Sequence, residues 1–530
     1  MPDVGLGSAF AWTLAGHSLA GWGIRSNEAA PQIPWPAVLD ARRPIVWDDS
    51  TTVGGGGDAA WLGPDATLAS TQATHHDTKD VRARSVFRAE SGDFGLNRYS
   101  LSFERGSATR WIRYEASSGR RDPYGPVGIS GDHVWDLSAS LTRGDHHFYG
   151  RIGQRGVARQ LAHADVSEDA SGQSGGARYE WSRGARSVSI QFDRGLDHRI
   201  DIIDVGGLAL SYSRREGQET RIEAGAGLPL GAGRIEARGL LSDASVTRTY
   251  DDAFRAHQKM WWGALQYERP TDEGTWNLGV GAGRMGALEQ NVVAPSAGVR
   301  FGSASAHGHA YVERMVHPVW SDLALGQAAF LQRTDVVGLE AGGHVRGLRA
   351  ETGVLVGSTR DRALVFPYPI EDIWLRAGIS AESERYDFAL LTLGATGGGG
   401  PVLFGASGFA LGRDQATSEP RVEPDYAGRA YLEDGFRIFK NDLGVRLRVE
   451  GAGIGERESK TGAIQEETLP AFWTASAIAV LTLSDVTATL RFANLEDQHV
   501  PQPWIDPGTG RLARGPGRAF RFTFTWRLLN

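Results

Sequence analysis

The sequence predicts an all-β protein, a transmembrane antiparallel up-and-down β-barrel of about 22 strands. Three observations predict this fold class. Apolar and polar residues alternate along many short segments, helical periodicity is almost absent, and the connections between segments alternate between long and short. The composition agrees, because 70 glycines among 530 residues indicate many tight turns, and 16 tryptophans are typical of chains whose rings lie at a membrane surface.

Composition also excludes several classes of function. The chain has no cysteine, which removes disulfides, thiolate metal sites and cysteine nucleophiles. The net charge is −7 and no block of like charge occurs, so the sequence has no basic patch of the kind that binds nucleic acid. The longest mostly apolar stretch, Ala471 to Leu483, is shorter than the roughly 20 residues that a spanning helix needs, so a helical membrane protein is excluded.

Residues 1–80 form a leader with little alternation, rich in proline between Pro31 and Pro44 and in glycine between Gly54 and Gly57. Its first residues, Met1 to Ala20, carry no convincing export signal. Three interpretations are open: a plug remnant that partly fills the barrel, a disordered tail, or the end of a plug whose beginning is lost to a wrong start codon. The last is favoured, and residues 81–530 are expected to form the barrel.

From Val81 onward, period-two alternation predicts strands with one apolar and one more polar face. The clearest is the last strand, where Phe520, Phe522, Phe524, Trp526 and Leu528 are apolar and the residues between them are polar. Other segments of this kind include Tyr99/Leu101/Phe103, Trp135/Leu137/Ala139/Leu141, Val188/Ile190/Phe192, Leu208/Leu210/Tyr212, Tyr386/Phe388/Leu390, Leu443/Val445/Leu447/Val449 and Leu490/Phe492.

Alternation of long and short connections predicts that all long loops lie at one end of a meander. Upstream of about residue 220 this alternation slips, because an expected loop from Gln154 to Gly176 falls on the wrong side. The weak segment Ala177 to Trp181 is therefore discounted, and an even count of 22 is preferred. A propeller or a β-helix would show fixed repeats, which are absent. The expected long loops are 241–257, 315–335, 358–371, 397–424, 452–469 and 496–515, and the expected tight turns are 346–347, 381–384, 440–442 and 484–485.

The C-terminal hundred residues contain further motifs: Phe439-Lys-Asn-Asp442, Leu469-Pro470, Asn494-Leu495-Glu-Asp497, and Pro516-Gly517-Arg518 before the last strand. This arrangement resembles the end of the barrel of TonB-dependent receptors, in which an Asn-Leu-x-Asp motif closes the penultimate strand and Pro-Gly-Arg opens the last one.

The resemblance implies a 22-stranded outer-membrane barrel around an N-terminal plug. It also implies import of iron chelates, cobalamin or glycans, with energy drawn through a box that contacts TonB. The sequence differs from the family in two places. Residues 1–80 contain no recognisable plug or TonB box, and the chain ends Leu528-Leu529-Asn530 instead of on an aromatic residue.

Several short motifs have structural interpretations. Gly281-Ala-Gly283-Arg-Met-Gly286 matches a dinucleotide fingerprint, but no helix is expected after it, so its glycines are assigned to a barrel face. Gly172-Gln-Ser174-Gly-Gly176 matches a nucleophile elbow and is assigned to a loop. The pairs His75-His76 and His146-His147 lack converging ligands, and adjacent strand residues point to opposite faces.

Charges and rings are expected to lie on opposite sides of the wall. Arg446, Arg448 and Glu450 are candidate lumen charges, because an Arg or Lys facing lipid at mid-depth costs about 2 to 4 kcal/mol. The apolar residues of the last strand are expected to face lipid and to carry the insertion signal. Strand-end tryptophans are assigned to an aromatic girdle or to substrate stacking: Trp261, Trp262, Trp320, Trp473 and Trp526.

The sequence therefore predicts a receptor or transporter of the bacterial outer membrane that passes a solute bound by long outer loops. A passive porin-like channel is an alternative, as is a non-transporting adhesin or receptor acting through loops 397–424 and 315–335. No enzyme activity, cofactor or metal is expected. The expected partners are outer-membrane lipid and lipopolysaccharide, the barrel-assembly machinery and an unknown small solute, with TonB added if a plug precedes the chain; nucleic acid is not expected.

Overall fold

The computed structural model describes residues 83–529, apart from short gaps. These gaps are 94, 108, 122–126, 162–164, 206–207, 250–252, 286–289, 304, 320–329, 361, 368–376, 383–385, 415–424, 462–464, 499–500, 507–510 and 515–516. Every regular element in the described part of the chain is a β-strand. None of the described residues forms a helix that is long and apolar enough to cross a membrane.

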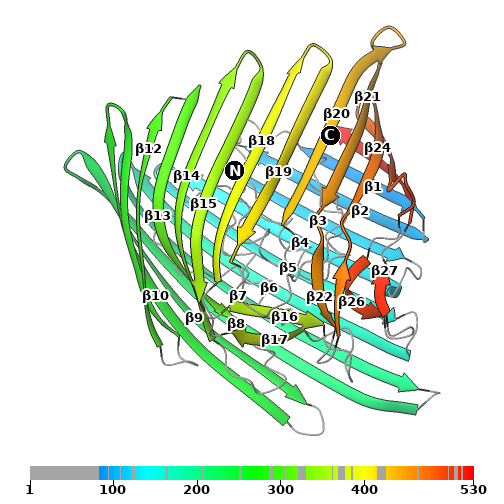
Figure 1. The fold of residues 1–530 in the computed structure, drawn as a ribbon, viewed down its shortest axis with the longest axis horizontal. Coiled ribbons are helices and arrows are strands. Elements are labelled where there is room, and N and C mark those ends of the chain that lie inside the picture. The colour runs from blue at the N-terminus through cyan, green and yellow to red at the C-terminus, as the bar shows by residue number, and fades with distance from the viewer. Residues whose placement is uncertain are drawn as a thin grey trace.

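The protein is a closed antiparallel barrel of 22 strands (Figure 1), as the sequence predicts. Each strand pairs with the next along the chain, and β1 pairs with β28 to close the ring. The strands of the wall are β1 Arg84–Gly92, β2 Leu96–Ser107, β3 Arg110–Arg121, β4 Val127–Arg143, β5 His146–Leu161, β6 Asp165–Arg183, β7 Arg186–Val205, β8 Leu208–Leu230, β9 Gly233–Thr249, β10 Ala253–Thr271, β11 Gly274–Met285, β12 Gln290–Gly302, β13 Ala306–Val319, β14 Phe330–Val345, β15 Leu348–Arg360, β18 Tyr386–Gly399, β19 Val402–Arg413, β20 Tyr426–Ile438, β21 Leu443–Ile454, β24 Phe472–Leu483, β25 Val486–Ala493 and β28 Ala519–Leu529.

Three two-stranded hairpins stand outside the main sheet, each within a long connection at the same end of the barrel. In Figure 1 they lie at the lower end, away from the tight turns, and β16, β22 and β26 contact one another. Long loops therefore gather at one mouth, as predicted. The hairpins are β16 Arg362–Pro367 with β17 Ala377–Glu382, β22 Arg457–Thr461 with β23 Gln465–Leu469, and β26 Pro501–Asp506 with β27 Arg511–Arg514.

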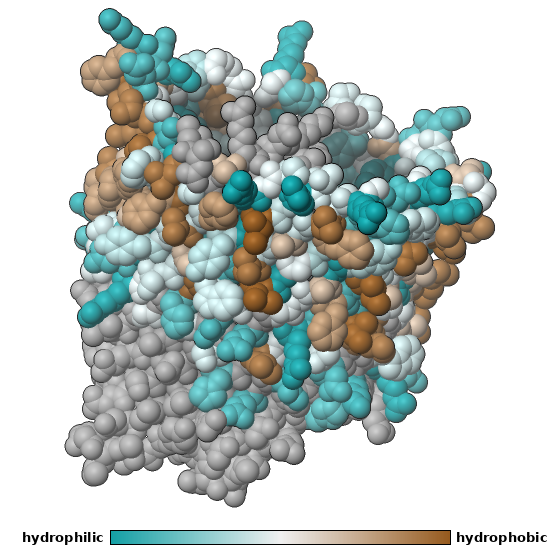
Figure 2. Space-filling model, turned by 180° about the vertical axis from the view of Figure 1, so that it is seen from behind, coloured by the Kyte–Doolittle hydropathy of each residue, from teal (hydrophilic) through white to brown (hydrophobic). Residues whose placement is uncertain are grey.

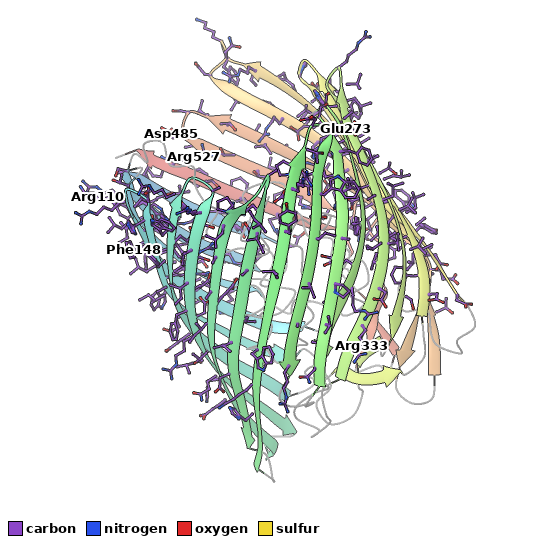
Figure 3. The ribbon with its side chains drawn as sticks, turned by 90° about the vertical axis from the view of Figure 1, so that its left-hand side faces the viewer. Arg110, Phe148, Glu273, Arg333, Asp485 and Arg527 are labelled. Carbon is purple, nitrogen blue, oxygen red and sulfur yellow. The ribbon has the colours of Figure 1, made fainter. Side chains whose placement is uncertain are left out.

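The opposite mouth is built from tight turns. Arg346 and Gly347 both have positive φ, 48° and 84°, which matches the right-handed twist of the flanking strands. Gly144, with φ 59°, begins another two-residue turn. The predicted turns 346–347, 440–442 and 484–485 all occur here, between β14 and β15, β20 and β21, and β24 and β25. In Figure 3 the labelled turn residues Glu273 and Asp485 lie at this end, and Arg333 lies toward the other.

Alternation places apolar side chains on the outside of the wall. On β14 the outward Val337 is 60% exposed, whereas the inward Val336 is 3% exposed. Large exposed hydrophobic residues recur on nearly every strand of the wall, and Figure 2 shows patches of hydrophobic residues among polar ones on the face behind that of Figure 1. Exposed apolar patches of this kind are typical of a surface that a membrane or another protein covers.

Every predicted long connection contains strand, and 358–371, 452–469 and 496–515 hold strands of the hairpins described above. Other predicted connections differ from the observed wall strands. Gln154 to Gly176 belongs to β5 and β6 apart from a short gap, so Ala177 to Trp181 is part of a true strand. The expected loop 241–257 is largely β9 and β10, and 397–424 contains β19. The expected loop 315–335 contains the end of β13 and the start of β14, and the expected tight turn 381–384 begins within β17, at the long-loop end.

Candidate functional site: the lumen wall and the closing seam

The predicted lumen charges share one face of β21. Arg448 Nη2 lies 3.1 Å from Glu450 Oε2, and its guanidinium lies 3.9 Å from the centre of the Tyr431 ring. Arg491 Nη2 on β25 reaches Glu450 across β24 at 3.4 Å. The residue between the pair, Val449, is on the opposite, exposed face. The structure thus brings Arg448 and Glu450 together on the inner face, and Arg446 Nη1 lies 3.7 Å from Glu433 Oε1 on β20.

Further ion pairs extend this face around the seam to β9. We call the inner face from β20 through β28 and β1 to β9 the charged arc. Strand spacing explains it, since residues two apart in a strand point to the same side. Its ion pairs include Arg88–Glu90, Arg98–Glu90, Arg113–Glu115, Arg151–Asp136, Arg178–Glu180, Arg234–Glu236, Arg238–Glu236, Arg446–Glu433, Arg448–Glu450 and Arg491–Glu450.

The inner face of β13 to β19 carries an apolar cluster beside charged side chains: His309 Nδ1 lies 3.8 Å from Glu340 Oε2, and Glu313 is 7% exposed. We call the cluster the apolar arc; it combines side chains from β13, β14, β15, β18 and β19, with Leu390 only 1% exposed. If this wall faced an open, water-filled channel, these side chains would be exposed to water. Sequence reasoning found the alternation of Phe388 and Leu390 on β18 but did not place that face toward the lumen, because alternation alone does not say which face of a strand is inside. The cluster is Tyr311, Val336, Leu355, Phe388, Leu390 and Leu411, with Phe409 packed against it.

The closing seam joins the last strand to the first. Phe524 is registered with Ala89 of β1 and Ala488 of β25, and Trp526 with Phe87 and Val486. Phe87 and Tyr99 stack 6.5 Å apart across β1 and β2. The predicted lipid-facing residues therefore continue one apolar outer stripe across the seam: Phe520, Phe522, Phe524, Trp526 and Leu528.

The motif Asn494 to Asp497, singled out in the sequence, forms a compact clamp where β25 ends. Asn494 and Asp497 have φ of 53° and 59°, a conformation that Asn and Asp tolerate better than most residues. The Asn494 side chain donates to the Gln498 carbonyl at 2.6 Å and accepts from the Gln498 N–H at 3.1 Å. The Asp497 carboxylate accepts from the Arg518 N–H at 2.6 Å, and Arg518 Nη2 donates to the Leu495 carbonyl at 2.8 Å.

This clamp fixes both ends of the last long connection against the wall. The Leu495 N–H donates to the Ala475 carbonyl at 2.9 Å, and the Glu496 carboxylate accepts from the Ala475 N–H at 2.8 Å. Gly517 and Arg518 form a bend directly before β28, while Pro516 lies outside the described residues.

Asp93, in the turn after β1, is a seam residue that sequence reasoning missed. Its carboxylate accepts from the Phe520 N–H at 2.6 Å, and its own N–H donates to the Phe520 carbonyl at 3.0 Å. These two hydrogen bonds extend the antiparallel pairing of β1 and β28 by one residue pair. No motif marks Asp93, because its partner is at the other end of the sequence.

Among the residues that the structure describes, the remaining sequence motifs form no chemical centre. Gly281 and Gly283 lie within β11, as expected of a barrel face, whereas Gly172 to Gly176 lies within β6 and not in a loop. His146 contacts Tyr179 and His147 lies 3.7 Å from Glu180, on opposite faces of β5, as expected. His75 and His76 lie outside the described residues.

Among the described residues, no group of three or more His, Asp or Glu side chains could hold a metal. Of the predicted girdle, Trp261, Trp473 and Trp526 are outward and about half exposed, and Trp320 lies outside the described residues. The barrel therefore combines ion pairs on one arc, an apolar cluster on the other, and long loops at one mouth.

The closed barrel with one loop-rich mouth has the fold of TonB-dependent receptors, transporters of the bacterial outer membrane. The copper transporter OprC matches with a TM-score of 0.70 at 12% identity, covering 86% of this chain and 81% of that one. The FrpB iron transporter of Neisseria meningitidis matches with 0.67 at 9%, covering 85% and 82%. The siderophore receptor PirA of Acinetobacter baumannii matches with 0.65 at 9%, covering 85% and 81%. No protein-family model and no curated protein matches the sequence.

Proposed function

We propose that the protein is an outer-membrane receptor and transporter that binds a small solute at its loop-rich mouth and passes it through the lumen. The structures that share its fold are transporters and receptors, with copper, iron or siderophores in their printed names. Its outer wall is apolar on nearly every strand, which fits lipid on all sides. The bacterial outer membrane is the location that this fold supports.

The burial of the apolar arc favours a gated transporter over an open porin. Leu355, Leu390 and Leu411 are 4% exposed or less, although they face the lumen. A barrel of this size leaves a wide lumen unless something fills it. We propose that the leader, residues 1–80, is a plug or plug remnant, and that residues 81–530 form the barrel.

Conductance of the purified protein in planar bilayers tests this proposal. The full chain is expected to give little or no steady conductance. A variant lacking residues 1–80 is expected to give large, weakly selective openings, while its resistance to SDS at room temperature shows that the barrel is folded. Large conductance from the full chain would instead indicate a passive porin-like channel, and equal low conductance from both would rule out the leader as the plug.

A non-transporting adhesin would rely on the outer loops alone. The expected adhesive loop 397–424 contains β19, so the sequence-based case for that function is weaker. Binding of TonB and of the assembly machinery stays a prediction from the family resemblance. Co-purification of TonB with the full chain is the measurement that would support energised transport.

A further inference from the structure

On the outside of the barrel, β7 to β10 carry two adjacent rows of outward side chains with opposite chemistry. The first row contains four large apolar residues that are between 40% and 58% exposed: Phe192, Ile222, Leu241 and Trp261. The next row toward the long-loop end is Arg194, Thr220, Asp243 and Lys259. The two rows form a boundary between apolar and charged side chains with a tryptophan at its edge, which is typical of the level where hydrocarbon meets lipid headgroups.

Arg284 extends the charged row to β11. Its side chain is exposed on the outer face, and the residue is registered with Trp261 of β10. Within the part of the chain that the structure describes, neither Arg284 nor Arg194 forms an ion pair or a side-chain hydrogen bond. Their guanidinium donors are therefore available to a partner outside the barrel.

Asp243 supplies the carboxylate of this row. Its Oδ1 lies 2.7 Å from His257 Nε2, and its Oδ2 lies 3.8 Å from Lys259 Nζ, whose side chain is 71% exposed. We call Arg194, His257, Lys259 and Arg284 the basic rim. With His257 neutral, three cations and the Asp243 carboxylate leave a net charge of +2 on this sector.

The corresponding boundary on β13 to β19 has the opposite charge. Its outward row is Arg314, Asp335, Ser358, Asp387 and Asp414. Here the arginine is paired, because Arg314 donates to both carboxylate oxygens of Asp335 at 2.6 and 3.1 Å. One cation and three carboxylates leave −2, so the positive excess belongs to the β7 to β11 sector alone among these two.

We propose that the basic rim binds the phosphate groups of a lipopolysaccharide molecule, whose acyl chains lie against the apolar row. This inference rests on the proposed outer-membrane location but not on transport. The longer loops of such barrels face the cell exterior, so the basic rim lies at the level of the outer leaflet. Clustered cations attract anionic lipid headgroups, and the forked donors of arginine match phosphate oxygens.

The width of the basic rim favours lipopolysaccharide over a phospholipid. Arg194 and Arg284 are four strands apart, which is roughly 19 Å at about 4.8 Å per strand. The single phosphate of a phospholipid cannot contact both ends of this row. A lipopolysaccharide headgroup carries several phosphates on linked sugars and can span it.

Binding of purified lipids to the full-length protein refolded in detergent tests the proposal, with native mass spectrometry as the measurement. The probes are deep-rough lipopolysaccharide, the same lipopolysaccharide after chemical removal of its phosphates, and phosphatidylglycerol. Phosphorylated lipopolysaccharide is expected to bind most tightly, and removal of its phosphates should weaken binding by about tenfold or more.

Substitutions locate the site on the barrel. Arg284→Gln should weaken lipopolysaccharide binding about fivefold, the usual contribution of one cationic side chain near an anionic lipid surface. The triple variant Arg194→Gln/Lys259→Gln/Arg284→Gln should weaken it by about a hundredfold when the three effects add. Arg314→Gln is the matched control, because it removes an outward arginine from the acidic sector of the same boundary, and it should leave binding unchanged.

The heat-induced gel shift verifies that each variant is folded. Binding by the triple variant equal to that of the original protein, equal losses for Arg284→Gln and Arg314→Gln, or tight binding of the phosphate-free lipid would overturn the proposal. Phosphatidylglycerol bound as tightly as lipopolysaccharide would overturn it too, because the rim would then recognise negative charge alone. The assay requires no passage through the lumen, so its outcome is independent of the bilayer test.

Discussion

Phe524 and Thr523 are adjacent on β28, but their side chains point to opposite sides of the wall. Phe524 is registered with Ala89 and Ala488 on the outer stripe, whereas Thr523 is registered with the inward Glu90. A one-residue shift in a strand exchanges lipid for lumen. Single substitutions at these two positions therefore report the direction of each face.

Phe524→Arg is expected to reduce insertion strongly, because an arginine facing hydrocarbon costs about 2 to 4 kcal/mol near the midplane. Thr523→Arg is its control, since the new guanidinium would face the Glu90 carboxylate in the lumen. The measurement is the yield of heat-modifiable protein in the outer-membrane fraction. Similar yields, or a lower yield for Thr523→Arg, would show that the faces are assigned the wrong way round.

Asp93 supplies a second prediction at the residue scale. Asp93→Ala removes the acceptor for the Phe520 N–H, which is worth about 1 kcal/mol, and should lower the temperature at which the folded band disappears on a gel. Asp93→Asn keeps an acceptor oxygen and should behave almost like the original protein. If both variants lose the folded band at the same temperature as the unmodified protein, the hydrogen bonds between Asp93 and Phe520 do not stabilise the seam.

At the scale of elements, local alternation identified strands but not the sheet that each one joins. The predicted loop 397–424 hides β19, while the expected tight turn 381–384 implies a wall strand where β17 pairs instead with β16. Discounting Ala177 to Trp181 removed part of β6, and the predicted loop 397–424 hid β19, so the count of 22 is right although the strands behind it are not all those observed. Alternation depends on neighbours in sequence, whereas membership of the wall depends on distant pairing.

The hairpins outside the wall should be dispensable for the barrel. Ile454 of β21 and Phe472 of β24 are already register partners, so a short turn can join these strands. Replacing residues 457–469 by two glycines should leave SDS resistance and the heat-induced gel shift unchanged. Loss of the gel shift would mean that β22 and β23 are needed to hold the wall together.

At the scale of the whole molecule, the sequence predicted the 22-stranded barrel, while the lipid-facing role of the β28 stripe and the lumen role of the β21 charges stay predictions. It did not predict the division of the lumen into two arcs. The charged arc had a readable signal in Arg and Glu spaced two residues apart, as in Arg448 and Glu450, but the apolar arc had none, because alternation does not say which face of a strand points into the lumen. Closure itself joins residues at the two ends of the barrel sequence, and no local pattern encodes that contact.

The most direct test of the closed barrel is a disulfide across the seam. Ser85 and Leu528 are register partners in β1 and β28, and the chain has no other cysteine to compete. In the double variant Ser85→Cys/Leu528→Cys, mild oxidation of the membrane-inserted protein should link the two peptides, as detected by mass spectrometry after digestion. The control Ser85→Cys/Phe522→Cys, in which the second cysteine lies further along β28, should not link. Efficient linkage of the first pair alone is the predicted result; no linkage, or equal linkage of both pairs, would contradict closure in this register.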